Sequence, residues 1–421
     1  MNSSLMNICR GAARQATIAT LACTVILLAP TLGRAEAAGA GDGGVSAFYA
    51  WKSAVPVPPG KLLRSEPQEE RLALSGASRG VRLLYSSTDG LDGHTPIAVS
   101  GALYLPKGAL PEGGWPLLAW AHGTVGIADV CAPSWAGRSE RDITYLNHWL
   151  DQGYAVVAPD YQGLGTPGGH PYLTARPEAY SVLDSVRAVE GGDFGLSKKV
   201  VIIGQSQGGG AAFAATVFAK SYAPELDIRG AVATGTPNLS PAGFAANAKA
   251  NAEATDKVSP TFAYFLLILY TIAETDPSFA IADYVNDKAA ATTELAKTTC
   301  LGAIEKQVVA EGLTFKNSFK KDPTKPFMAT TALMAYPTLK TAIPIFMGTG
   351  GKDLDVPPPG QESLVKDACA AGTHIEWRFY PDFDHSATVN GSLPDSTPFV
   401  KRAFAGETIE GNCAATLAGQ K

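Results

Sequence analysis

The chain has 421 residues, of which 46% are hydrophobic and 17% are charged, and its formal net charge is −5 at pH 7. A chain of this charge without a visible basic stripe is not expected to bind nucleic acid. Its length exceeds that of an average domain and is sufficient for a large hydrophobic core with an insertion.

The N-terminus has the pattern of a secretory signal peptide. Arg10 and Arg14 precede an apolar stretch at 16–32, and a small-x-small cleavage site follows at 35–37. A membrane anchor is the alternative, but the threonines and the proline within the stretch favour cleavage. We therefore expect a signal peptide at 1–37 and secretion to the extracellular space or the periplasm.

Four of the six cysteines lie beyond the expected signal peptide. They are Cys131, Cys300, Cys369 and Cys413. An even number in a secreted chain predicts two disulfides, and four cysteines can pair in three ways. A zinc site is the alternative, but the sequence has neither the C-x-x-C pattern nor the histidine spacing that would support it.

Most of the chain alternates predicted strands with predicted helices. The strand candidates are short apolar or β-branched runs at 81–86, 97–105, 115–121, 154–158, 200–203, 228–233, 343–347 and 375–380. The first two are expected to form an antiparallel pair. Ile143, Leu146 and Leu150 share one face of a helix between the third and fourth strands. This alternation predicts a mainly parallel sheet with helices on both faces.

The alternation stops between Thr236 and Tyr336. The residues there contain no clear strand and are rich in Ala, Lys and Asn. Their apolar run TFAYFLLILY, at 261–270, is too short to span a bilayer. We expect it to be a buried helix of a helical cap, and the alternative is a face that contacts lipid.

A lone serine lies between a predicted buried strand and an alanine-rich helix expected at 207–222. Gly204 and Gly208 flank Ser206, and they remove the Cβ atoms that would collide in a sharp strand-to-helix turn. This is the G-x-S-x-G pattern of a nucleophile elbow, which exposes the serine hydroxyl. The pattern alone is weak in a chain with 44 glycines, and the flanking strand and helix strengthen it.

A serine hydroxyl becomes a nucleophile when a base takes its proton and an acid orients that base. In the chain order of α/β-hydrolases the acid follows the serine and the histidine comes last. His374 and His385 are the histidines beyond Ser206. His385 is favoured because it follows the carboxyl end of the last predicted strand, where ligand chemistry collects in open α/β sheets.

The acid is expected in the loop after the strand at 343–347. Asp353 and Asp355 are the candidates, and the D-x-x-V-P spacing favours Asp353. The alternative role for either carboxylate is to cap the helix near Ser363.

The backbone N–H groups of Thr124 and Gln207 are the expected oxyanion hole. One belongs to the loop after the third predicted strand and the other to the residue after the nucleophile, and Gly123 is the alternative in the loop.

Five stretches together resemble the secretory lipase family of the α/β-hydrolase superfamily. They are AHGTVGIADVCAPS (121–134), PDYQGLGTPGGHPYL (159–173), GQSQGGG (204–210), GKDLDVPP (351–358) and DHSATV (384–389). The resemblance implies an α/β-hydrolase domain at 38–421, with a helical cap at about 236–336 inserted before the acid residue. It also implies the disulfides Cys131–Cys300 and Cys369–Cys413. The family contains lipases and esterases, so it implies no acyl chain length, and the second aspartate of GKDLDVPP departs from its pattern.

The sequence therefore predicts a secreted serine hydrolase that cleaves acylglycerols or other lipophilic carboxylic esters through an acyl-enzyme. His385 would deprotonate Ser206, the N–H groups of Gln207 and Thr124 would hold the oxyanion, and Asp353 would steady the imidazolium. We expect no metal and no organic cofactor. The expected partner is a small-molecule ester or lipid, with transient contact between the cap and a lipid interface. The alternatives are an acyltransferase or serine peptidase of the same fold, and a binding protein without catalysis.

Overall fold

The computed structural model describes residues 39, 41–247, 249, 252 and 255–419. The expected signal peptide at 1–37 lies outside the described residues. Within the described part of the chain, no helix is long and apolar enough to cross a membrane.

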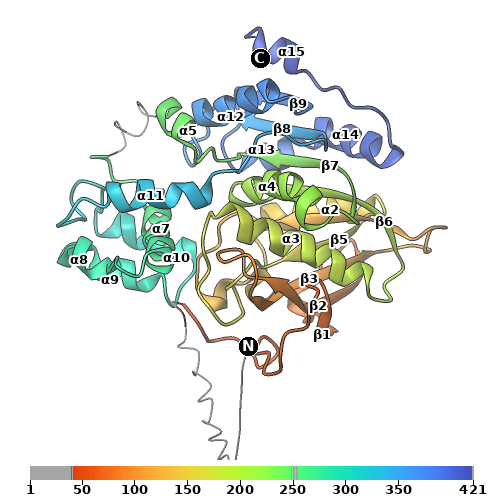
Figure 1. The fold of residues 1–421 in the computed structure, drawn as a ribbon, viewed down its shortest axis with the longest axis horizontal. Helices are drawn as coiled ribbons and strands as arrows, with labels where there is room; N and C mark the ends of the chain where they lie inside the picture. The colour runs from red at the N-terminus through yellow and green to blue at the C-terminus, as the bar shows by residue number, and fades with distance from the viewer. Residues whose placement is uncertain (1–38, 40, 248, 250–251, 253–254, 420–421) are drawn as a thin grey trace, which may run out of the picture. The chain divides into compact units, whose positions relative to one another are not determined.

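A nine-stranded sheet forms the centre of the fold, in the order β1-β2-β3-β5-β4-β6-β7-β8-β9 (Figure 1). Its strands are β1 (Leu62–Pro67), β2 (Ala77–Thr88), β3 (Pro96–Pro106), β4 (Trp115–Ala121), β5 (Ala155–Pro159), β6 (Leu196–Gln205), β7 (Asp227–Thr234), β8 (Ile345–Gly350) and β9 (Ile375–Tyr380). The first three pair antiparallel with their neighbours, and β3 pairs antiparallel with β5. The pairs from β5 to β9 are parallel. The expected mainly parallel sheet is therefore confirmed.

All eight predicted strands are present, and β1 was missed. Its sequence, LLRSEP, is half polar, and its second half is exposed because it lies at the edge of the sheet. An edge strand of this kind carries no apolar pattern that sequence analysis could detect. With β1 counted, the strand before the nucleophile elbow is the sixth in chain order, and it contains the predicted strand at 200–203.

Helices cover both faces of the sheet, as predicted. On one face, the buried cluster includes residues of α3 (Ala175–Glu190), α4 (Gln207–Tyr222) and α12 (Pro358–Ala370). On the other, it includes α2 (Glu140–Asp151) and α14 (Leu393–Ala405). The shorter elements are η1 (Glu70–Leu72), η2 (Asp129–Cys131), α1 (Pro133–Ala136), α13 (Ala387–Gly391) and α15 (Cys413–Leu417). The sheet is thus shielded from solvent and holds its strand ends in fixed positions.

The chain between β7 and β8 is helical: its first helix packs on α12, and the helices that follow form a group of their own. The described helices are α5 (Pro241–Ala246), α7 (Phe262–Thr275), α8 (Ile281–Tyr284), α9 (Asp287–Leu295), α10 (Leu301–Ala310) and α11 (Thr324–Met334). Figure 1 shows α7 to α11 gathered to one side of the sheet. Leu266, Leu267 and Leu269 of α7 are fully buried in a core that these helices share. The apolar run 261–270 is therefore packed inside the insertion, in agreement with the buried-helix interpretation.

Two disulfides tie distant parts of the fold together. Cys131 is the last residue of η2, in the loop that follows β4. It is bonded to Cys300 at the start of α10. Cys369 in α12 is bonded to Cys413 at the start of α15. These are the two pairs that the family resemblance implied, and the first joins the insertion to the loop that follows β4.

Candidate active site

Ser206 lies on a strained turn between β6 and α4. Its φ of 57° and ψ of −124° place a non-glycine residue in a sparsely populated backbone region. A Cβ on Gly204 would lie 2.0 Å from the carbonyl oxygen of Gly208, and a Cβ on Gly208 would lie 1.9 Å from that of Ala121. The two flanking glycines are therefore required by close backbone contacts, as the elbow pattern predicted.

The structure pairs His385 with Asp353. Nδ1 of His385 lies 2.7 Å from Oδ2 of Asp353, and both side chains are buried. Gln361 donates to the same oxygen at 2.9 Å. The backbone N–H groups of Asp355 and Val356 donate to the other carboxylate oxygen at 3.0 and 2.8 Å. The two backbone N–H groups and the Gln361 amide hold the carboxylate in place, so the carboxylate can hold the imidazole in one orientation and one tautomer.

Asp355 has a different partner. Its carboxylate accepts a 2.7 Å hydrogen bond from the hydroxyl of Tyr264 on α7, so it faces the insertion. Among the described residues, Asp353, Asp355 and His385 also form the one group of three candidate metal ligands, with ligand atoms within 4.8 Å. Since those atoms are already occupied by hydrogen bonds, the geometry favours orientation of His385 over metal ligation.

Ser206 and His385 both lie against the end of β7. The N–H of Ser206 donates to the carbonyl of Thr234 at 2.9 Å. A Cβ on the next residue, Gly235, would lie 2.8 Å from Cε1 of His385. Within the described chain, however, the Ser206 hydroxyl has no hydrogen bond to the ring. Nε2 of His385 instead lies 2.8 Å from the side-chain Nε2 of Gln205. Catalytic hydrogen bonds are often long or poorly aligned without substrate, so the missing hydrogen bond between Ser206 and His385 is compatible with a serine–histidine pair.

The expected oxyanion donors lie beside the elbow. Gln207 is the first residue of α4, where a helical N–H has no partner within its own helix. No described residue accepts a hydrogen bond from the backbone N–H of Gln207 or of Thr124. Thr124 is held through its side chain, whose Oγ1 lies 2.7 Å from the hydroxyl of Tyr172. Two free N–H groups and a helix N-terminus suit the stabilisation of a developing negative charge.

A buried polar network fixes the Gln207 side chain, and sequence analysis missed it. Its Nε2 donates to Glu178 at 2.8 Å and lies 3.0 Å from Nε2 of His170. Burial raises the pKa of Glu178 to about 8, although the hydrogen bonds from Gln207 and from the Leu173 N–H act in the opposite direction. Burial lowers the pKa of His170 to about 4, so this imidazole is neutral at pH 7. His170 belongs to a stretch that supports the family resemblance, but only the fold brings it to Gln207.

Gln205 also contacts the candidate site, and the sequence did not single it out. The G-x-S-x-G pattern treats its position as variable. Its side chain is buried and contacts His385 on one side and Arg141 of α2 on the other.

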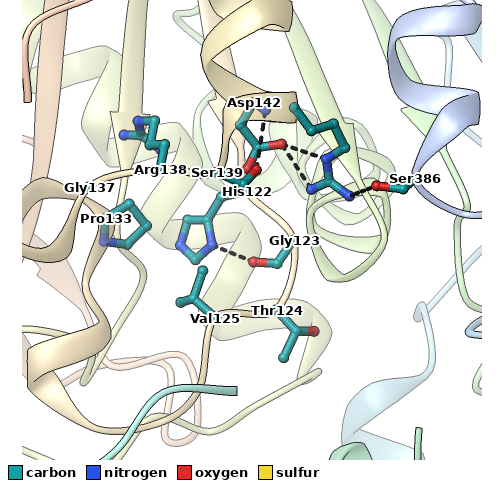
Figure 2. A pocket seen from close by; sticks show the side chains of 11 residues that line it. His122, Gly123, Thr124, Val125, Pro133, Gly137, Arg138, Ser139, Asp142 and Ser386 are labelled. Atoms are coloured by element: carbon teal, nitrogen blue, oxygen red, sulfur yellow. Dashed lines mark hydrogen bonds and ion pairs between the residues drawn. The ribbon is translucent and has the colours of Figure 1, made fainter. Parts of the chain in front are cut away.

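A cavity of about 220 Å³ opens beside the loop that contains Gly123 and Thr124. Figure 2 shows these two residues and His122 on its wall, with Asp142 and Ser386 across from Arg138. Ser386 directly follows His385, but Ser206, Asp353 and His385 are not among the residues that line this cavity.

Glu178→Gln tests the buried network through its effect on stability. The folded-state pKa of about 8 lies above the ordinary value of 4.5, so between these values the folded chain holds a proton that the unfolded chain releases. Raising the pH through this window must therefore lower the free energy of unfolding of the wild type, by up to about 1.4 kcal/mol per pH unit. The variant should lack this contribution. Urea unfolding at pH 5, 6, 7 and 8 measures it, with exposed Glu112→Gln as the control; parallel curves for wild type and Glu178→Gln would contradict the prediction.

Comparisons with known proteins agree with this architecture. Lipase A of Moesziomyces aphidis is 26% identical over 297 residues, and the match covers 64% of this chain and 58% of that protein. The chain thus spans little more than half the length of that relative. The crystal structure of Candida antarctica lipase A is similar with a TM-score of 0.68 and 22% identity, over 89% of this chain and 92% of that one. The esterase LipA of Xanthomonas oryzae, described as degrading rice cell walls, has a TM-score of 0.64 and 21% identity, over 82% of this chain and 98% of its own.

The fold is therefore that of the α/β-hydrolases, with a nine-stranded sheet and a helical insertion between β7 and β8. A family model described as secretory lipase matches residues 136–412, which include the elbow, the insertion, the paired aspartate and histidine, and one cysteine of each disulfide, Cys300 and Cys369. On this match the chain belongs to the secretory lipase family.

Proposed function

We propose that the protein is a secreted serine hydrolase that cleaves lipophilic carboxylic esters, such as acylglycerols, through an acyl-enzyme. The observation that carries the proposal is the buried Asp353–His385 pair at the end of β7, beside the strained turn that presents Ser206. Membership of the secretory lipase family and the two disulfides support secretion, to the extracellular space or the periplasm.

In the proposed mechanism, Nε2 of His385 takes the proton of Ser206 as the serine oxygen attacks the ester carbonyl. The N–H groups of Gln207 and Thr124 stabilise the oxyanion, and Asp353 stabilises the imidazolium that forms. His385 then gives its proton to the leaving alcohol, which leaves an ester between the acyl group and Ser206. Water, activated by the same nitrogen, releases the acid and restores the hydroxyl.

Apolar side chains of the insertion support an apolar acyl group. Phe265 of α7 is half-buried, and its ring contacts the rings of Phe315, Phe319 and Phe327 at centroid distances of 5.1 to 5.7 Å. Leu354, between the two aspartates of the acid loop, is 82% exposed. A long apolar acyl chain or a lipid surface would cover such groups, which is the basis for proposing a transient contact with a lipid interface.

Ser206→Ala should abolish ester hydrolysis. Loss of the nucleophile from a triad costs on the order of 10⁶ in turnover. Hydrolysis of p-nitrophenyl butyrate measures the loss, and circular dichroism and thermal unfolding show whether the variant is folded. Ser221→Ala changes an exposed serine near the other end of α4 and should keep wild-type activity. A folded Ser206→Ala protein with wild-type turnover would falsify the proposed function.

Asp353→Asn should reduce turnover far more than Asp355→Asn. Asp353 accepts the hydrogen bond of the His385 ring, whereas Asp355 accepts that of Tyr264. Losing the orienting carboxylate costs on the order of 10⁴ in turnover in serine hydrolases, because the wrong imidazole tautomer is favoured. Comparable losses in the two variants, or a larger loss in Asp355→Asn, would show that the acid is assigned to the wrong residue.

The acyl chain profile tests the role of the insertion. If the phenylalanine cluster around Phe265 contacts the acyl chain, each added CH₂ should favour the transition state by up to ~0.8 kcal/mol until the site is filled. The value of kcat/KM should then rise from acetyl to octanoyl esters, and Phe265→Ala should flatten the rise while acetate hydrolysis is kept. Phe279→Ala, which removes a ring from the same core at its contact with Tyr284, controls for loosening of the insertion. A wild-type profile that peaks at acetate would indicate a short-chain esterase whose apolar run serves only the core of the insertion.

A further inference from the structure

Gln205 is the residue before Ser206, and its role as inferred below rests on the proposed function. Its side chain is buried in contact with His385, Arg141 and the oxyanion loop. Nε2 of the amide lies 2.8 Å from Nε2 of His385, and Oε1 accepts a 3.0 Å hydrogen bond from Arg141. A Cβ on Gly123 would lie 2.4 Å from Oε1, so only glycine in that loop leaves room for the amide.

Arg141 fixes which end of the amide faces the histidine. A guanidinium can only donate hydrogen bonds, so the amide oxygen must face Arg141 and the NH₂ group must face His385. Arg141 is itself held by Asp142, at 2.8 Å, and contacts the hydroxyl of Ser386 at 3.5 Å. The amide therefore cannot flip without leaving a guanidinium donor without its acceptor.

The proton positions on the ring follow from its two partners. The carboxylate of Asp353 accepts from Nδ1, so Nδ1 carries the hydrogen and Nε2 of the neutral ring is an acceptor. Gln205 donates to that lone pair. It is the same lone pair that must take the proton of Ser206, and one nitrogen lone pair cannot serve two donors well.

We propose that Gln205 is a positioning residue that competes with Ser206 for His385: it occupies Nε2 of the neutral ring in the free enzyme and releases it when substrate binds and the serine attacks. Once His385 is protonated, Nε2 becomes a donor and faces the donor of Gln205. The imidazolium is then directed away from the amide, toward the oxygen of the leaving alcohol.

The other charged groups around His385 are unchanged when only Gln205 is replaced. The acid loop contributes Asp353 and Asp355, and the histidine loop contributes Asp384. From α2, Arg141 and Asp142 form the ion pair behind the amide. The remaining neighbour, the turn after β7, presents glycine and has no titratable group there. A shift in the pH profile on replacing Gln205 therefore reports the loss of the amide together with its contact to Arg141.

Two substitutions separate competition from a merely structural role. Gln205→Leu removes the donor, which should raise the plateau of kcat/KM about two- to tenfold, the factor expected for loss of one competing hydrogen bond. It should also move the acid limb of the profile to higher pH, because the donor stabilised the neutral ring. Gln205→Glu keeps the contact with Arg141 but accepts from the protonated ring, so its acid limb should lie about one pH unit or more above that of Gln205→Leu.

The measurement is kcat/KM for p-nitrophenyl butyrate between pH 4 and 9, for wild type, Gln205→Leu and Gln205→Glu. Histidine-labelled protein gives the same midpoints from the ring Cε1–H resonance of His385 by NMR, even for a variant that has lost activity. The pH at the midpoint of the acid limb should be lowest for the wild type, higher for Gln205→Leu and highest for Gln205→Glu. Unchanged midpoints with a lower plateau would overturn the proposal and leave Gln205 a structural residue. Ser206→Ala, assayed in parallel, distinguishes the two hypotheses. If Ser206→Ala keeps its activity, the serine mechanism is refuted. If Ser206→Ala is inactive but the Gln205 variants show unshifted midpoints, only the role of Gln205 is refuted.

Discussion

The close contact between the turn at Ser206 and the ends of its two neighbouring strands determines the geometry of the whole site. On one side, the absence of a Cβ at Gly208 lets α4 begin against the carbonyl of Ala121, where β4 ends and the oxyanion loop begins. On the other side, the N–H of Ser206 is bonded to Thr234, where β7 ends and the chain turns beneath His385. A strained residue of this kind costs about 1–3 kcal/mol. The buried β6 and α4 offset that cost, because both are packed in the main core and cannot relax independently.

Three glutamines hold the groups around this turn. Gln361 donates to the carboxylate of Asp353, Gln205 contacts the ring of His385, and the side chain of Gln207 is anchored on Glu178 and His170. An amide both donates and accepts without carrying charge, so it can link a buried carboxylate, imidazole or guanidinium at a lower desolvation cost than another ion. Among the described residues, the Oε1 atoms of Gln207 and Gln361 are buried without a hydrogen-bond partner, so these two amides act here only as donors.

The insertion is packed around its own core and contacts the site at a few defined points. Tyr264 of α7 donates to Asp355, directly beside the aspartate that orients His385. The disulfide between Cys131 and Cys300 ties the start of α10 to the chain beyond β4. The insertion is therefore joined to both the acid loop and the loop after β4 through short connections.

Local patterns in the sequence were sufficient for eight of the nine sheet strands, the flanking helices and the glycines of the elbow. Each of these depends on hydrophobic periodicity or on backbone space within a few residues, and such constraints are visible in a single sequence. The edge strand β1 was missed because half of it is polar and exposed. The separate partners of Asp353 and Asp355, and the contact of Gln205 with His385, join residues 32, 91 and 180 positions apart. Only the tertiary structure decided them, because a hydrogen bond forms where the fold brings a donor within about 3 Å of an acceptor, and no local pattern encodes that distance.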